Sequence, residues 1–342
     1  MMSTMPVDRA SLTVDDVRTA LDVAVRAPSI HNTQPWRWRL GSDGLALLAD
    51  RSRQLAVADP DGHSLVLSCG AALWLTEVGL RAQGWQIETE TLPDPGDADL
   101  LALIRPIGRG APSEPDAARA EAALRRRCDR RPFADRTVDE GDFDALQAAA
   151  SDTRARVDFP VREDERIDLA VAVSWADRVE RDDQAYIAEM TRWLRDPEVH
   201  ALAEGIPLDV VPHVPSDHPR RTDVPLRDFE LGMSGRQMVE RDVDERPLIG
   251  VVLTDFDNAA DHLAAGHSMM RLMLQAQLMG MSTCPLSQAV DFAAFRTRVQ
   301  RVMGWVGYPQ IMLRIGYPTT PIDEIPRTPR REPAAVLQVV QV

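Results

Sequence analysis

The stretch APSIHNTQPW, residues 27–36, decides how this chain is interpreted. Two prolines stiffen the loop, which presents a hydroxyl, an imidazole and two amides before an aromatic strand begins. Polar groups held in this way suit a planar heterocycle with alternating hydrogen-bond donors and acceptors. A simpler role fits equally well, in which polar side chains tie down the end of the preceding helix.

Helix and strand patterns surround this loop. Apolar residues recur at helical spacing over 13–27, where Thr13 and Asp16 form a variant capping box. A long helix at 61–82 is apolar nearly all round; because Glu77 interrupts it and it is short for a membrane span, we expect a core helix. Strands are expected at 36–40, 45–49, 86–92 and 100–107.

A loop rich in Gly, Pro and Ala at 108–115 marks the expected boundary between an N-terminal half, 1–112, and a C-terminal half, 113–342. The second half has its own long apolar helix, 258–279, which ends at Gly280. Two such helices predict a pseudo-symmetric pair at the centre of the molecule. The other expected elements are a helix ending in the arginine run 125–131, helices at 140–150, 166–179 and 184–194, and strands at 247–254 and 310–315.

The segment 196–247 differs from the rest of the chain. It is rich in proline and charge, and its periodicity is weak. Long irregular segments of this kind are typical of a lid or a binding loop, or else of disorder.

Composition excludes several classes of protein. The 342 residues include 39 basic and 53 acidic side chains, and the net charge of −14 argues against nucleic-acid binding. Every basic residue is an arginine, so the chain has neither a Schiff-base lysine nor a P-loop. No pattern predicts a metal site, a Rossmann dinucleotide site or a membrane partner. Three distant cysteines and the absence of a signal-peptide pattern lead us to expect a cytoplasmic protein.

Three further segments could carry chemistry. The arginine run suits a phosphate dianion, although a solvated basic helix end is the stronger interpretation from charge alone. Residues 280–287 follow a buried helix and include several small side chains, so their backbone could approach a ligand closely. Cys284 in this segment fits a packed thiol better than a nucleophile. The tail 317–331 carries Arg327, Arg330 and Arg331 and is either solvated or a second grip on the same phosphate.

Together these motifs resemble the FMN-dependent nitroreductase family, and more closely its Acg-like branch of NAD(P)H nitroreductases. The loop 27–36 is similar to the family's APSxxNxQPW signature. The run 126–133 resembles its RRSxRxF element, with Cys128 where serine is usual. Residues 280–285 resemble its GLGTCP turn, and 316–318 resemble its LGYP ending.

The resemblance implies an α+β fold, a three-layer α/β/α sandwich, with two pseudo-symmetric halves that mimic the family homodimer. The signature loop lies in one half and the arginine motif in the other, so it implies one flavin site per chain, possible function as a monomer, and a lid-like insertion at 196–247. The cofactor would be FMN, reduced by NADH or NADPH. The residues that it assigns to FMN are Pro28, Ser29, Ile30, His31, Asn32, Gln34, Arg126, Arg127, Cys128, Arg130, Thr283, Cys284, Pro285, Gly316, Arg327 and Arg330.

Two functions remain open. In the first, an enzyme passes hydride from NAD(P)H through FMN to a small nitroaromatic or quinone-type acceptor, and no protein side chain acts as a nucleophile. In the second, the protein stores or sequesters FMN under a lid formed by 196–247, with little turnover.

Overall fold

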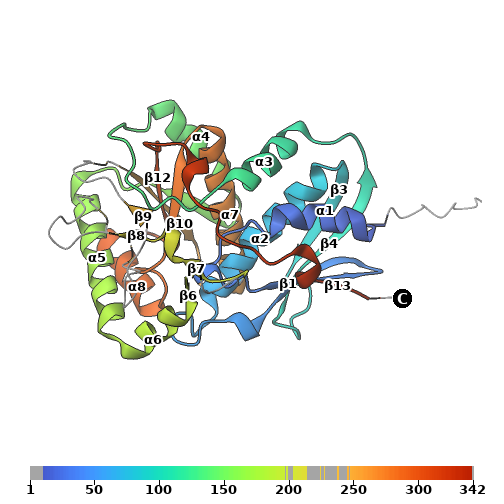
Figure 1. The fold of residues 1–342 in the computed structure, drawn as a ribbon, viewed down its shortest axis with the longest axis horizontal. Coiled ribbons are helices and arrows are strands. Elements are labelled where there is room, and N and C mark those ends of the chain that lie inside the picture. The colour runs from blue at the N-terminus through green and yellow to red at the C-terminus, as the bar shows by residue number, and fades with distance from the viewer. Residues whose placement is uncertain are drawn as a thin grey trace, which may run out of the picture.

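The computed structural model describes residues 11–196, 198, 203–213, 224, 227, 237–238, 245 and 247–340, with only the backbone for 212–213 and 237–238. Much of the predicted lid, 196–247, therefore lies outside the described residues. Two mixed helix-and-sheet halves meet along a pair of long central helices (Figure 1). The mixed α and β content agrees with the predicted class.

The N-terminal sheet has five strands in the order β13-β1-β2-β4-β3. Four of them come from the first half of the chain and pair in antiparallel fashion. The fifth, β13, comes from the C-terminus and joins β1 in parallel, so the tail of the chain completes the first sheet. The bounds are β1 (Trp36–Gly41), β2 (Gly44–Ala49), β3 (Trp85–Thr91), β4 (Leu100–Arg109) and β13 (Leu337–Val339).

The C-terminal sheet has four antiparallel strands in the order β11-β12-β10-β5. In reverse, this order is β5-β10-β12-β11, the same arrangement as β1-β2-β4-β3 in the first half. In each half the long central helix lies between the second and third of these strands along the chain. The bounds are β5 (Ala155–Asp158), β10 (Leu248–Thr254), β11 (Ser282–Leu286) and β12 (Tyr308–Gly316).

The central helices are α2 (His63–Arg81) and α7 (Ala259–Leu278), which pack against each other. A Cβ atom on Gly70 of α2 would lie 2.1 Å from the carbonyl oxygen of Leu263, and one on Gly266 of α7 would lie 1.8 Å from that of Leu67. Each glycine is the eighth residue of its helix, since 70 − 63 and 266 − 259 are both 7. Reciprocal glycines let the two backbones touch at equivalent points.

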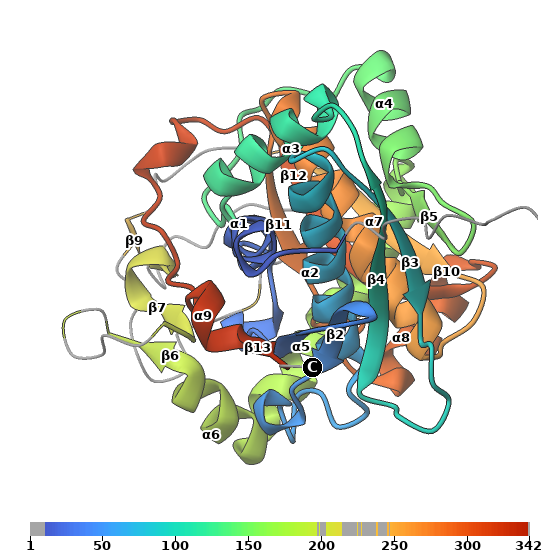
Figure 2. The same ribbon diagram turned by 90° about the vertical axis from the view of Figure 1, so that its right-hand side faces the viewer.

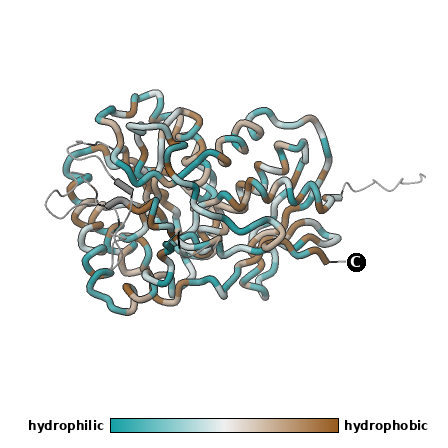
Figure 3. The backbone as a smooth tube through the Cα atoms, viewed as in Figure 1, coloured by the Kyte–Doolittle hydropathy of each residue, from teal (hydrophilic) through white to brown (hydrophobic). Residues whose placement is uncertain are grey.

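Helices cover both faces of the C-terminal sheet, which gives three layers there (Figure 1). Figure 2 shows the C-terminal segment, in red, beside the strands of the N-terminal sheet. One face packs on α7, and the other on α5 (Glu163–Asp182) and α8 (Ala293–Met303). The alternation along β10 explains this, because Val252 joins the central core while Val251 joins the α5–α8 cluster. The hydropathy colouring in Figure 3 shows more hydrophobic residues along the inner strands and helices than on the outer loops.

Further helices complete the central layer and the surface. The central pair packs against α1 (Val14–Ala24), α3 (Glu114–Arg125) and α4 (Glu140–Ala150). The capping box predicted at Thr13 and Asp16 is confirmed, with reciprocal hydrogen bonds of 3.1 and 3.0 Å. The short elements are α6 (Gln184–Trp193), α9 (Pro333–Val336), β6 (Leu194–Arg195), β7 (Ile206–Pro207), β8 (Pro212–His213), β9 (Gln237–Met238), η1 (Ile30–Asn32), η2 (Arg51–Arg53), η3 (Leu208–Val210) and η4 (Ile322–Glu324).

Two predictions about elements need correction. The helix before the arginine run ends at the first arginine: α3 stops at Arg125, Arg126 takes an extended ψ of 140°, and the rest of the run lies outside the helix. Residues 282–286, which we expected to be a small-residue exit segment, form strand β11. The expectation for 61–82 is confirmed, since α2 is apolar enough to cross a membrane, yet all of its residues except Arg81 are buried inside the protein.

Candidate functional site

A cavity at the junction of the two halves gathers most of the predicted residues. Its empty volume, counted with the open solvent at its mouth, is about 990 Å³. The predicted residues on its wall are Pro28, Ser29, Ile30, His31, Asn32, Cys128, Arg130, Cys284, Pro285 and Arg330. The structure thus brings the signature loop, the arginine motif, β11 and the tail around one space.

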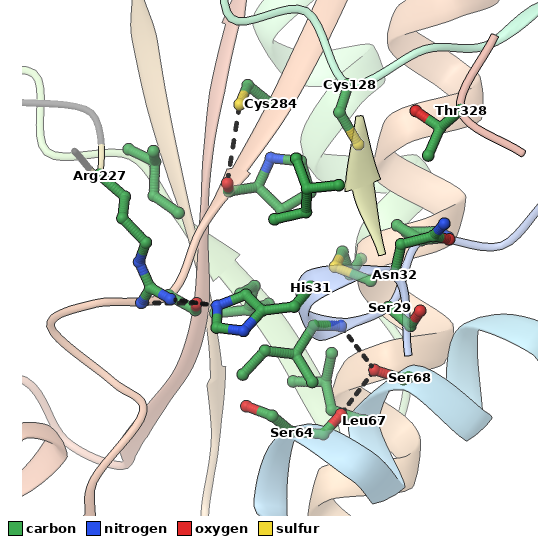
Figure 4. Close-up of a pocket in the computed structure, with 18 of the residues that line it drawn as sticks. Ser29, His31, Asn32, Ser64, Leu67, Ser68, Cys128, Arg227, Cys284 and Thr328 are labelled. Atoms are coloured by element: carbon green, nitrogen blue, oxygen red, sulfur yellow. Dashed lines mark hydrogen bonds between the residues drawn. The ribbon is translucent and has the colours of Figure 1, made fainter. Parts of the chain in front are cut away.

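Other residues on the cavity wall were not predicted. They come from α2, α7, the 196–247 segment, the end of β11, β12 and the tail, and Figure 4 labels five of them: Ser64, Leu67, Ser68, Arg227 and Thr328. Ser64 and Ser68 gave a signal that could have been used, because they are four residues apart at the start of an otherwise apolar helix. The unpredicted wall residues are Ser64, Leu67, Ser68, Ile206, Val210, Arg227, Met269, Leu286, Ser287, Gln288, Ile311 and Thr328.

The signature loop has an unusual backbone. Three residues other than glycine have positive φ angles, 45° at His31, 56° at Asn32 and 51° at Gln34. Such residues are uncommon, and they persist only where the surroundings fix them. Here the Ser29 hydroxyl oxygen accepts a hydrogen bond from the backbone N–H of Gln34 at 2.9 Å. The loop therefore holds its side chains in a set orientation.

Amide side chains tie this loop to the second half of the chain. The Asn32 Nδ2 group donates to the carbonyl oxygens of Gly205 at 2.9 Å and Pro329 at 3.1 Å. Gln34 donates to Ala203 at 2.7 Å and accepts from the backbone of Arg331 at 2.8 Å. The Asn32 Oδ1 atom is buried and has no partner among the described residues.

Arginines gather at one end of the cavity. Arg126 donates to the carbonyl oxygen of Arg26 at 2.9 Å and to the Cys128 sulfur at 3.5 Å. Neither Arg26, Arg126, Arg127 nor Arg330 forms an ion pair with a carboxylate of the part of the chain that the structure describes. Each of the four also has a buried Nε atom without a hydrogen-bond partner there. We call these four residues the unpaired arginine cluster.

Burial and neighbouring positive charges both disfavour the charged form of arginines in this cluster. Burial, together with Arg126, lowers the pKa of Arg330 to about 9. Burial and the nearby Arg327 also lower the pKa of Arg127. Guanidinium groups are otherwise charged at any ordinary pH. An anion bound among them would remove the repulsion that lowers these pKa values.

The two cysteines on the cavity wall differ in chemistry. Burial opposes ionisation of Cys128, but Arg126 and Arg130 outweigh it, so the pKa of the Cys128 thiol is lowered. Burial raises the pKa of Cys284 to about 11. Cys284 therefore fits a packed thiol, whereas Cys128 is the more reactive of the two.

The other end of the cavity holds a fully paired arginine. Arg227 forms ion pairs with Asp291 and, at 3.4 Å, with Glu180, and all three side chains are buried. It also donates to Ser287 at 3.3 Å and contacts the His31 Nε2 atom at 2.8 Å. Figure 4 shows the Arg227 guanidinium group directed at the His31 ring.

Comparison with known proteins identifies relatives along nearly the whole chain. The chain is 36% identical over 327 residues to a Mycobacterium tuberculosis H37Rv protein named "Putative NAD(P)H nitroreductase Rv3131", covering 95% of this chain and 91% of that protein. It is 32% identical over 332 residues to "Putative NAD(P)H nitroreductase acg" of the same strain, covering 94% of each.

The chain belongs to this NAD(P)H nitroreductase family. Membership confirms the resemblance that the motifs indicated, together with the fold class and the expectation of an oxidoreductase. No protein-family model matches the chain. A solved structure, a nitroreductase with bound FMN from Bacteroides fragilis, aligns with a TM-score of 0.38 and 11% identity over 65% of this chain and 98% of that one.

Six residues that the resemblance assigned to the site of this nitroreductase-family chain do not line the cavity. Gln34 lies behind the loop, while Arg126, Arg127 and Arg327 lie around the arginine end. Thr283 pairs with Cys128 in a short parallel bridge. Gly316 packs against Phe133, because a Cβ at this position would lie 2.5 Å from that ring. Their roles toward a cofactor stay predictions.

Proposed function

We propose that this chain binds FMN in the cavity and transfers hydride from NAD(P)H to a nitroaromatic or quinone-type acceptor. The observation that carries the proposal is the unpaired arginine cluster beside the cavity that the signature loop lines. Arg126 and Arg127 are buried, Arg26 and Arg330 are partly buried, and each of the four has a buried Nε atom without a partner among the described residues. Cationic groups placed in this way are costly unless an anion joins them. A phosphate dianion is the group that arginine forks bind best.

The polar atoms at the signature loop fit the ring of the same cofactor. The His31 Nδ1 and Asn32 Oδ1 atoms belong to two consecutive residues of the cavity wall. Both atoms are buried, and neither has a hydrogen-bond partner among the described residues. An imidazole nitrogen and a carbonyl oxygen can supply a donor and an acceptor. The edge of the isoalloxazine ring carries both kinds of group, so this pair supports a flavin rather than a plain phosphate ester.

Each part of the cavity would have its own task. Arg126, Arg127 and Arg330 would hold the phosphate, and the small residues of β11 would let the ring lie close to the backbone. Leu67, Met269 and Ile311 would exclude water from the ring. NAD(P)H as reductant and a small-molecule acceptor are consistent with the names of the relatives.

We also propose that the chain is a fused pair of equivalent halves with one site. The shared strand order and the reciprocal Gly70 and Gly266 contacts support equivalence of the halves. The single cavity described above takes its signature loop from the first half and its arginines mainly from the second. One FMN per chain and a monomer in solution are the expected results of mass spectrometry and light scattering.

One spectrum of the purified protein tests the cofactor. We expect a yellow protein after incubation with FMN, and a colourless one when Arg126→Ala is combined with Arg130→Ala. The matched control combines Arg119→Ala with Arg125→Ala, because both arginines lie on α3 and pair with nearby carboxylates away from the cavity. If the first double variant retained stoichiometric FMN, the phosphate assignment would be wrong.

FMN sequestration is the second candidate. Ile206, Val210 and Arg227 of the 196–247 segment line the cavity, so this segment does reach the proposed flavin site. Anaerobic addition of NADPH separates the candidates. Bleaching of the bound flavin supports an enzyme, whereas persistent colour supports sequestration.

A further inference from the structure

Arg227 lies in a segment without a recognisable motif, yet it is among the most completely paired side chains at the cavity. Its Nη2 atom contacts Asp291 and Glu180, and the guanidinium lies 5.8 Å from the centre of the Tyr186 ring. Its Nη1 atom is left for the imidazole of His31, at 2.8 Å from Nε2. The carboxylates therefore fix the position of the group that contacts His31.

This contact determines where His31 carries its proton. A guanidinium group can only donate hydrogen bonds, so the His31 Nε2 atom must accept. An imidazole whose Nε2 accepts is neutral and carries its hydrogen on Nδ1. A charged ring would place two cations against each other, and burial together with Arg227 and Arg130 lowers the pKa of His31 well below its usual range.

The remaining nitrogen is a donor without a partner. His31 Nδ1 is buried, and no described residue accepts a hydrogen bond from it. His31 lines the cavity, and its φ angle of 45° holds the side chain in an orientation that an unconstrained loop would rarely adopt. A buried donor left unpaired is costly, which points to a ligand acceptor.

We propose that Arg227 is a positioning residue that fixes the Nδ1-protonated form of His31, so that His31 donates a hydrogen bond to an acceptor atom of the flavin ring. This rests on the proposed FMN site. Reduction makes the ring richer in electrons, so a donor at this position stabilises the reduced state more than the oxidised state. His31 then tunes the potential of the cofactor and does not act as an acid or a base.

The first arm of the test follows the proton directly and needs no flavin. Nitrogen spectra of protein labelled at histidine, with the His31 signal identified by its loss in His31→Gln, report which ring nitrogen is protonated. We expect Nδ1–H in the wild type at pH 7, and a shift toward Nε2–H when Arg227→Met is combined with Asp291→Asn. That pair of changes removes a cation and an anion together, which limits the damage to folding.

The second arm measures the potential of bound FMN against a reference dye. Asparagine at position 31 keeps a donor at the distance of Nδ1 from the backbone, whereas glutamine places its amide near Nε2. We expect His31→Asn to retain the wild-type potential. His31→Gln and the Arg227/Asp291 double variant should each favour oxidised FMN by about tenfold, or about 30 mV for a two-electron couple.

Control and contrary outcomes are distinct. The matched control combines Arg296→Met with Asp257→Asn, an ion pair at 3.0 Å outside the cavity wall in which Arg296 is buried and Asp257 half-buried, and should change neither the His31 signal nor the potential. Protonation of Nε2 in the wild type, or an unchanged potential in both His31→Gln and the Arg227/Asp291 variant, would overturn the inference. A wild type that takes up no FMN would overturn the proposed function instead, while the nitrogen spectrum would still decide the role of Arg227.

Discussion

The two ends of the cavity hold arginines in opposite electrostatic states. At one end, the unpaired arginine cluster has no described carboxylate partner, and burial together with the charge of Arg126 lowers the pKa of Arg330. At the other, Arg227 is surrounded by Asp291 and Glu180. The difference teaches that arginines near one cavity can have different roles: unpaired guanidinium groups favour binding of an anion, whereas a paired guanidinium group orients the side chains that it contacts.

Removing two of the unpaired arginines should have the largest effect. Each charge-assisted hydrogen bond contributes about 1.5–3 kcal/mol, so Arg126→Ala with Arg330→Ala should weaken FMN binding by roughly 10²–10⁴-fold. The same variant without FMN should unfold in urea at the wild-type concentration or higher, because a repulsion is relieved. Loss of stability in the apo protein would show that these arginines are structural.

Arg227 should behave in the opposite way. Arg227→Met leaves the buried Asp291 carboxylate without a cation and removes a hydrogen-bond partner of Glu180, and breaking a buried pair costs about 3–5 kcal/mol. We expect a stability loss of that size in urea unfolding of the apo protein, and a smaller loss when Asp291→Asn is added. A loss below about 1 kcal/mol for the single variant would place Arg227 outside the structural framework.

The pH dependence of the free energy of unfolding tests the protonation of the groups around Arg227. Burial raises the pKa of Glu180 to about 8, so between the ordinary glutamate pKa of about 4.3 and pH 8 the folded state holds a proton that the unfolded state has lost. Stability from this group is therefore present at low pH and is lost as pH rises through that window. Asp59, whose pKa burial raises to about 7, acts in the same direction.

The comparison of Glu180→Gln with wild type isolates one of these two groups. Glutamine imitates the protonated acid, so the variant should match the wild type in urea unfolding at pH 4, below the ordinary glutamate pKa, and exceed it at pH 8.5. Equal slopes of stability against pH in the two proteins would mean that Glu180 is ionised in the folded state.

Sequence could predict the site mainly where residues carry their own chemistry. The loop 27–36, Arg130, Cys284 and Arg330 were all expected at the cofactor, and they do meet at one cavity. The two long helices were also predicted from their apolar composition, and they form the central pair α2 and α7. These features are local, so a short stretch of residues reveals them.

Arg227 could not have been predicted in this way. Its segment has no periodicity, and its partners, Glu180 and Asp291, lie on separate elements far along the chain. The same reason explains β11, whose Thr-Cys-Pro sequence suggests a turn and becomes a strand only because β12 pairs with it. Tertiary contacts determine the structure at such positions, and these contacts cannot be inferred from the local propensity of the sequence.

The smallest expected effect concerns Cys128, whose sulfur contacts Arg126 of the unpaired arginine cluster. Serine there would provide a stronger hydrogen-bonding group, so Cys128→Ser should tighten FMN binding by a few fold, in line with about 0.5–1.5 kcal/mol for one hydrogen bond. Because the arginines lower the pKa of Cys128 while burial raises that of Cys284 to about 11, iodoacetamide should modify Cys128 first, and FMN should protect it. Equal labelling of both cysteines, with or without FMN, would show that the arginine cluster does not reach the thiol, and the cluster would then have to bind its anion without Cys128.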